Sequence, residues 1–143
     1  MIVVDTNILA YLLLTGEHTS EAEQVLAKDP VWAAPVLWRS ELRNVLALYI
    51  RKQGLTVEQA QRIMEKADDV LAGREFGLSS RPVLQLVANS ACSAYDCEFV
   101  ALAYELGVRF VTADRRVLVE FPNVAVSPAG FVQGNSGSTE AGT

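Results

Sequence analysis

The sequence predicts an α/β fold in which a mainly parallel sheet lies between layers of helices. Short apolar stretches that suit strands alternate with longer stretches that have the helical period, and this alternation is typical of such folds. The first stretch, at 2–4, is apolar without polar alternation, as expected of a strand that is buried on both faces. The 143 residues, 50% of them hydrophobic, are enough for one domain with a real core.

Two helices are expected after this first strand. The first covers 8–14, and Thr6 and Asn7 are polar residues that can cap it. The second opens with a capping box at 20–23, where a Ser is followed three residues later by a Glu. It ends at Asp29, because the next residue is a proline.

The middle of the chain repeats the alternation. A short strand is expected at 31–34, followed by a long helix at 36–52 that Gly54 ends. A capping box at 56–59 opens the next helix, whose apolar residues follow the helical period closely. A further strand is expected at 74–78.

The last part of the chain has the same pattern and then loses it. The expected elements are a helix from Pro82, a helix at 95–106 ended by Gly107, a strand at 109–112, a short helix at 117–121 and a strand at 123–126. We interpret residues 1–132 as one domain, because no linker or repeat divides them. Residues 133–143 are rich in Gly and Ser without an apolar period, which predicts a disordered tail.

Several classes of protein are disfavoured by the composition. No apolar run is long enough to cross a bilayer and no secretory leader is visible, so we expect a cytoplasmic protein without membrane contact. Cys92 and Cys97 are interpreted as reduced core thiols and His18, the only histidine, as a surface residue. The sequence therefore has too few His and Cys residues for a typical zinc site. The net charge of −5 argues against a broad basic surface for nucleic acid, although a cation-binding cluster of acids would also lower it.

Two acids are expected at the carboxyl edge of the sheet. Asp5 and Asp114 each end an apolar strand and begin a helix. In open parallel sheets, this edge is where ligands bind. Taken alone, each Asp has an ordinary explanation as the N-cap of the helix that follows it.

Two further acids are expected on the inward faces of helices. Glu41 falls within the apolar arc of the long helix at 36–52, whereas Arg39, Ser40, Arg43 and Asn44 take the other side. Asp96 shares its face with apolar residues, and Glu98 and Glu105 are interpreted as solvated on the opposite face. Ordinary alternatives are a buried arginine partner for Glu41 and, for Asp96, a capping box with Ser93.

Taken together, the four acids predict a metal site. Several carboxylates at one place repel one another, and burial raises their pKa values further. A divalent cation removes both costs, and ligands that are all oxygen favour Mg²⁺ or Mn²⁺. Such a cluster suits metal-assisted hydrolysis of a phosphodiester by water.

Four stretches of the sequence resemble the PIN-domain nucleases, and within them the VapC toxins of prokaryotic toxin–antitoxin pairs. They are VVDTN at 3–7, WRSELRNVL at 38–46, SAYDCEFVALA at 93–103 and FVTADRRVL at 110–118. The resemblance follows the family's order and covers nearly the whole chain before the tail. It implies a PIN-like three-layer α/β/α sandwich and a Mg²⁺- or Mn²⁺-dependent endoribonuclease.

The resemblance also implies roles for residues and partners. It places the four acidic positions of the family on Asp5, Glu41, Asp96 and Asp114, and it suggests supporting polar roles for Thr6, Asn7 and Thr112. The expected partners are an RNA such as transfer or ribosomal RNA, a small cognate antitoxin and a second copy in a homodimer.

We expect Asp5 and Asp96 to bind the principal ion, with Asp114 completing that shell or holding a second ion. Glu41 would bind through water or orient the attacking water. Arg115 and Arg116 follow Asp114 and could hold RNA phosphates, or could simply be solvated helix charges.

Two other functions stay open from the sequence. One is a phosphatase that uses Asp5 as nucleophile, although a dehalogenase-type site would want a second Asp where Asn7 stands. The other is a module that binds a cation and a protein partner without catalysis.

Overall fold

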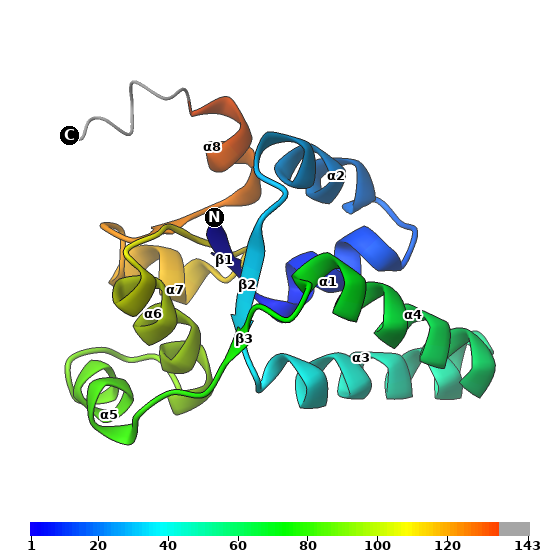
Figure 1. The fold of residues 1–143 in the computed structure, drawn as a ribbon, viewed down its shortest axis with the longest axis horizontal. Coiled ribbons are helices and arrows are strands. Elements are labelled where there is room, and N and C mark those ends of the chain that lie inside the picture. Colours follow the sequence, from blue (N-terminus) through cyan, green and yellow to red (C-terminus); the bar gives the residue numbers. More distant parts are fainter. Residues whose placement is uncertain (135–143) are drawn as a thin grey trace.

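The computed structural model describes residues 1–134 and is built around a five-stranded sheet (Figure 1). The strand order is β3-β2-β1-β4-β5, and every neighbouring pair is parallel. The strands are β1 (Ile2–Val4), β2 (Trp32–Pro35), β3 (Glu75–Phe76), β4 (Phe110–Val111) and β5 (Ala125–Val126). The five predicted strands are therefore confirmed, and the last three are shorter than expected.

Helices cover both faces of this sheet. They are α1 (Thr6–Leu13), α2 (Thr19–Lys28), α3 (Trp38–Gln53), α4 (Val57–Leu71), α5 (Ser80–Ala88), α6 (Ala94–Leu106), α7 (Arg115–Glu120) and α8 (Pro128–Gln133). In Figure 1 the central strands separate α5, α6 and α7 from α1 to α4. Helix α6 packs on β1, β2 and β4, whereas α4 packs on β2 from the other face. The predicted three-layer α/β/α fold is confirmed.

The core lies on both sides of β1 and β2. Val3 pairs with Ala33 on one side and with Phe110 on the other, so β1 is the central strand. All residues of β1 and β2 are buried, and Trp32 is fully buried. This burial explains why these strands are apolar throughout, since neither face meets water.

The caps of the first two helices differ from the prediction. Asp5, and not Thr6 or Asn7, is the N-cap of α1, because its Oδ1 accepts a hydrogen bond from the Ile8 amide at 3.0 Å. The expected capping box at 20–23 is wrong, since α2 begins at Thr19. The Thr19 hydroxyl instead bonds within the preceding loop, to the Gly16 amide, so loop contacts decide where this helix begins.

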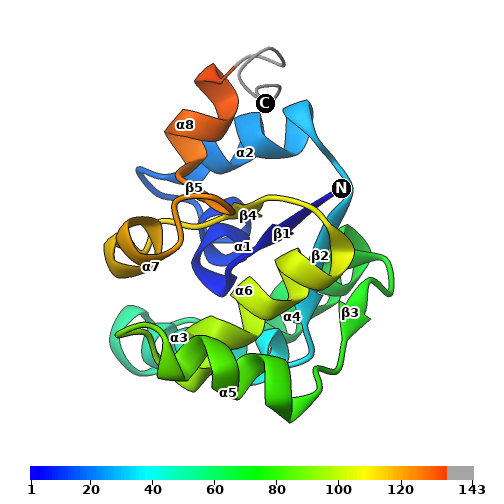
Figure 2. The same ribbon diagram turned by 90° about the vertical axis from the view of Figure 1, so that its left-hand side faces the viewer.

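Helix α8 was not predicted. It is a short helix with Pro128 in its first turn, and Ser127 caps it by accepting from the Gly130 amide at 3.0 Å. It packs against α2 (Figure 2). At this contact Lys28 lies 4.8 Å from the ring centroid of Phe131. Gln133, assigned to the tail by the sequence, ends this helix, and the rest of the predicted tail from residue 135 onward lies outside the described residues.

None of the helices within residues 1–134 has the length and apolar character that crossing a membrane requires.

The predicted helix ends at Gly54 and Gly107 are confirmed. Both glycines are C-caps with a left-handed backbone, at φ 70° and 68°. The capping box of Thr56 and Gln59 is also present at the start of α4. These signals depend on neighbouring residues only, which is why they could be recognised in the sequence.

Replacing Gly107 by Ala should lower the free energy of unfolding by about 1–2 kcal/mol, because a Cβ disfavours the left-handed conformation. Among the described residues, no atom other than those of its chain neighbours lies within 4 Å of the added Cβ, so the loss would be a backbone effect. Urea unfolding measures it. Gly77→Ala is the matched control, since Gly77 has equally free space but no positive φ. Equal stability of the two variants would contradict the prediction.

Candidate active site

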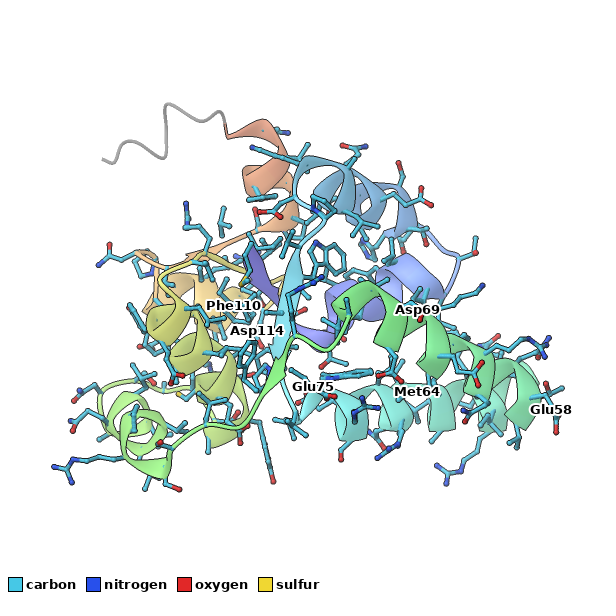
Figure 3. The ribbon with its side chains drawn as sticks, viewed as in Figure 1. Glu58, Met64, Asp69, Glu75, Phe110 and Asp114 are labelled. Carbon is cyan, nitrogen blue, oxygen red and sulfur yellow. The ribbon has the colours of Figure 1, made fainter. Side chains whose placement is uncertain are left out.

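Four carboxylates from four separate parts of the chain line one cavity. Asp5 joins β1 to α1, Glu41 lies on α3, Asp96 lies on α6, and Asp114 joins β4 to α7. The cavity has a volume of about 570 Å³ and lies at the carboxyl ends of β1 and β4. Figure 3 shows Asp114 close to Phe110, whose strand leads into the site. The structure thus places all four acids that the sequence singled out around one cavity.

Asp5 is the most perturbed of the four. Its two carboxylate oxygens accept from the Ile8 amide and from the Thr112 hydroxyl. Burial raises the pKa of Asp5 to about 6; these hydrogen bonds oppose that rise, and the charge of Asp114 adds to it. Near neutral pH, part of the population therefore still carries a proton on Asp5. A positive charge nearby would favour the ionised form of this carboxylate.

Thr112 connects the two acids at the strand ends. Its side chain is fully buried, and its hydroxyl donates to Asp5 while accepting from the Asp114 amide at 3.0 Å. The Asp5 amide also donates to the Val111 carbonyl at 3.2 Å, which ties the end of β1 to β4. The structure therefore places Thr112 as a fixed support of Asp5.

Asp114 is also the N-cap of α7. Its Oδ1 accepts from the amides of Arg116 and Val117 at 2.9 and 3.2 Å. The capping role that the sequence offered as an alternative is thus present, as it is for Asp5. It does not compete with a role in the cavity, because an ionised carboxylate has two oxygens and about four lone-pair sites.

Glu41 is half-buried and is held by Thr6. The Thr6 hydroxyl donates to Oε1 of Glu41 at 2.7 Å, and Thr6 itself is buried. Burial raises the pKa of Glu41, and the charges of Asp96 and Glu98 raise it further. Thr6 therefore supports Glu41, in the same way that Thr112 supports Asp5.

Asp96 lies in the first turn of α6, where the Ser93 hydroxyl accepts from the Asp96 amide at 3.1 Å. Burial raises the pKa of Asp96, as does the charge of Asp114, whereas Ser93 and Arg116 lower it. Asp114 thus interacts with both Asp5 and Asp96, and Asp96 in turn with Glu41. The four acids form one electrostatically coupled group.

The donor set fits a hard divalent cation, although the ligands are not drawn together. Within the described part of the chain, no three Asp, Glu, His or Cys side chains already stand close enough to share one ion. Repulsion keeps carboxylates apart until a cation screens it. Oxygens that each accept one hydrogen bond, as those of Asp5 do, keep a second lone pair for an ion.

Some cavity residues were assigned to the wrong side or missed. Ser40 and Asn44, predicted to face away from Glu41, line the cavity with it. Asn44 is three residues from Glu41 and so shares its side of the helix, a signal that was available. Glu98, predicted to be solvated, is half-buried and affects the pKa of Glu41. Tyr95, 62% exposed, also lines the cavity and carried no distinguishing pattern.

The remaining candidate residues differ in their exposure and in whether they line the cavity. Asn7 is exposed and lines the cavity. Arg116 is exposed, acts on Asp96 through its charge and donates to the Ala91 carbonyl at 3.4 Å. Arg115 is exposed but is not part of the cavity lining. Arg39 points away, as predicted, and forms ion pairs with Asp68 and Glu75 on the far side of α3.

Comparison with known proteins gives a consistent picture. The family model described as PIN domain matches residues 2–126. Ribonuclease VapC3 from Pyrobaculum aerophilum is 24% identical over 124 residues, which cover 85% of this chain and 95% of that protein.

Two solved structures have a similar fold. One is a toxin-antitoxin complex from Klebsiella pneumoniae, with a TM-score of 0.67 and 21% identity over 90% of this chain and 98% of that one. The other is FitAcB from Neisseria gonorrhoeae, with a TM-score of 0.70 and 19% identity over 90% of this chain and 99% of that one. At these identities the likeness is one of fold.

Asp5→Asn should stabilise the metal-free protein at neutral pH but not near pH 4. The pKa of Asp5 is about 6 in the folded chain, whereas its ordinary value is 3.8. Ionisation of Asp5 therefore favours the unfolded chain. Wild-type stability therefore falls as the pH rises from 3.8 through about 6, and the neutral Asn avoids this loss. The gain would approach about 3 kcal/mol at most, at about 1.4 kcal/mol per pKa unit.

Urea unfolding in EDTA at a series of pH values measures this difference. Asp69→Asn is the control, because Asp69 is exposed on α4, away from Asp114 (Figure 3). A stability difference between Asp5→Asn and wild type that does not change with pH would contradict the assignment.

Proposed function

The chain belongs to the PIN domain family, and we propose that it is a metal-dependent endoribonuclease that acts as the toxin of a toxin–antitoxin pair. The convergence of Asp5, Glu41, Asp96 and Asp114 on one cavity carries the proposal. The similarity to Ribonuclease VapC3 and to a toxin-antitoxin complex supports it.

The cofactor we propose is Mg²⁺ or Mn²⁺, because the available ligands are carboxylate oxygens. Asp5 and Asp96 would hold the ion, and Asp114 would complete its shell or hold a second one. When bound, the ion supplies a water of lowered pKa and stabilises the oxyanions of attack and departure. The raised pKa values of Asp5 and Asp96 fit this role, since burial raises both and the nearby charge of Arg116 offsets the rise at Asp96 only in part.

Glu41 is the residue that we assign to the attacking water. Its raised pKa makes it a better proton acceptor than an ordinary carboxylate, and Thr6 fixes its orientation. Water is the nucleophile in this proposal. The described lining contains no Cys or His, and the hydroxyls of Thr6 and Thr112 donate to Glu41 and Asp5. The exposed hydroxyls of Ser40 and Tyr95 are hydrogen-bonded to no base among the described residues.

The substrate we propose is RNA, with transfer and ribosomal RNA as the candidate classes. Arg116 is exposed and lies near enough to Asp96 for its charge to lower that pKa, and it would contact a phosphate next to the cut. Arg115, also exposed, would add a more distant contact. The proposed partners are a cognate antitoxin and a second copy of the chain, in the cytoplasm.

A phosphatase that uses Asp5 as nucleophile is disfavoured. Asn7 stands where the second Asp of a dehalogenase-type site would be, so that position lacks the carboxylate that such a site would want.

Wild-type protein should cleave RNA in Mg²⁺ or Mn²⁺ and stop in excess EDTA. Glu41→Gln should lower kcat by about 10²–10⁴-fold, the usual contribution of a general base, and Asp96→Asn should abolish cleavage by removing an ion ligand.

Gel analysis of a panel of structured RNAs measures the cleavage rate, with Asp69→Asn as the unaffected control. Cleavage that persists in EDTA would exclude the metal. Protein that binds Mn²⁺ but leaves every RNA intact would be a non-catalytic binding module.

Thr112→Val should lower kcat by about 10–100-fold, as is usual when a group that orients a metal ligand is lost. The Thr112 hydroxyl lowers the pKa of Asp5, so its removal should also shift the acid limb of the pH–rate profile to higher pH. Thr112→Ser keeps the hydroxyl and should restore both values. If Thr112→Val lowers stability but leaves the pH–rate profile unchanged, Thr112 has only a packing role.

A further inference from the structure

A second cavity adjoins the one that holds the acids. It has a volume of about 380 Å³ and is lined by residues of α1, of the loop between α1 and α2, and of α3. Helices α1 and α3 pack against each other, and the two cavities share Asn7 and Val45 as lining residues. A molecule that occupies the first cavity can therefore extend into the second without leaving the protein surface.

Three aromatic side chains line this second cavity. The rings of Tyr11 and His18 lie 4.5 Å apart between centroids with an interplanar angle of 36°. His18 is exposed, and Tyr49 on α3 is 38% exposed, so both keep ring surface for a further contact. Flat aromatic surface beside a phosphodiester-cleaving site is suited to stacking of an unpaired base. We call this space, with Tyr11, His18 and Tyr49, the aromatic cavity.

The charges around the aromatic cavity disfavour a phosphate. Glu17 belongs to its lining. Burial raises the pKa of the Tyr11 hydroxyl, and the negative charges of Asp5, Glu21 and Glu17 raise it further. An anion would be repelled here, whereas a neutral base could stack on the rings. Its amino groups could donate to the Glu17 carboxylate or to the side-chain oxygen of Asn7.

We propose that the aromatic cavity binds one nucleobase of single-stranded RNA next to the phosphate that is cut. This inference rests on the proposed nuclease function and adds a subsite to it. The continuity with the acid cavity, the aromatic lining and the negative surroundings together favour a base over a phosphate. A helix of a protein partner is the competing occupant.

Binding without cleavage tests this subsite. Fluorescently labelled homopolymers of A, C and U ribonucleotides are titrated against the Asp96→Asn protein, with and without His18→Ala or Tyr49→Ala. Loss of one stacked base should weaken binding by about 5–100-fold, and Tyr49→Phe should restore it because it keeps the ring. Tyr104→Ala is the matched control, since Tyr104 is 51% exposed on α6 and lines a separate groove.

A substrate lacking one base identifies the contact. In an RNA that the wild-type protein cuts, each nucleotide near the cut is replaced in turn by an abasic one. At one position the abasic RNA should bind weakly to the Asp96→Asn protein, and His18→Ala or Tyr49→Ala should then cause little further loss.

Equal RNA affinities for the His18→Ala, Tyr49→Ala and Tyr104→Ala proteins would overturn the proposed base subsite. The same result is expected if the aromatic cavity binds a protein partner and not RNA. That outcome leaves the nuclease proposal standing if wild-type protein still cuts RNA. Failure of wild-type protein to cut any RNA would instead refute the nuclease proposal on which the subsite rests.

Discussion

Repulsion among four half-buried carboxylates at the end of a parallel sheet is the constraint on which the site depends. Burial raises the pKa values of Asp5, Glu41 and Asp96, and the charge of a neighbouring acid raises each of them further. A protein without a function for this arrangement would gain stability by replacing at least one of them. The fold instead holds them in place, which is expected where stability has been given up for chemistry.

Helix N-termini and two threonines make the arrangement tolerable. Asp5 and Asp114 are N-caps, and Glu41 and Asp96 lie in the first turns of α3 and α6. All four acids therefore face the positive end of a helix dipole, which favours negative charge. Thr6 and Thr112 each add a hydroxyl that donates to a carboxylate. The parallel sheet brings these helix ends together, because every strand ends at the same edge.

The sequence predicted what local pattern controls. The strand ends at Asp5 and Asp114 and the glycine helix ends could be recognised because each depends on adjacent residues. The partner of Thr6 could not, since its hydroxyl bonds to a residue 35 positions away. Helix α8 was missed because it is short, and packing against α2 supports it more than its own composition does.

The bond from Thr112 to Asp5 spans 107 positions of the chain. Pairing of β1 with β4 requires the polypeptide to return to its own beginning, a contact of high sequence separation that forms slowly. While the ribosome is still making the first hundred residues, neither β4 nor Thr112, the partners of this end of β1, has been made. A nascent or truncated chain of that length contains Asp5, Glu41 and Asp96 but lacks Thr112 and Asp114, so the complete centre exists only once translation has passed Asp114.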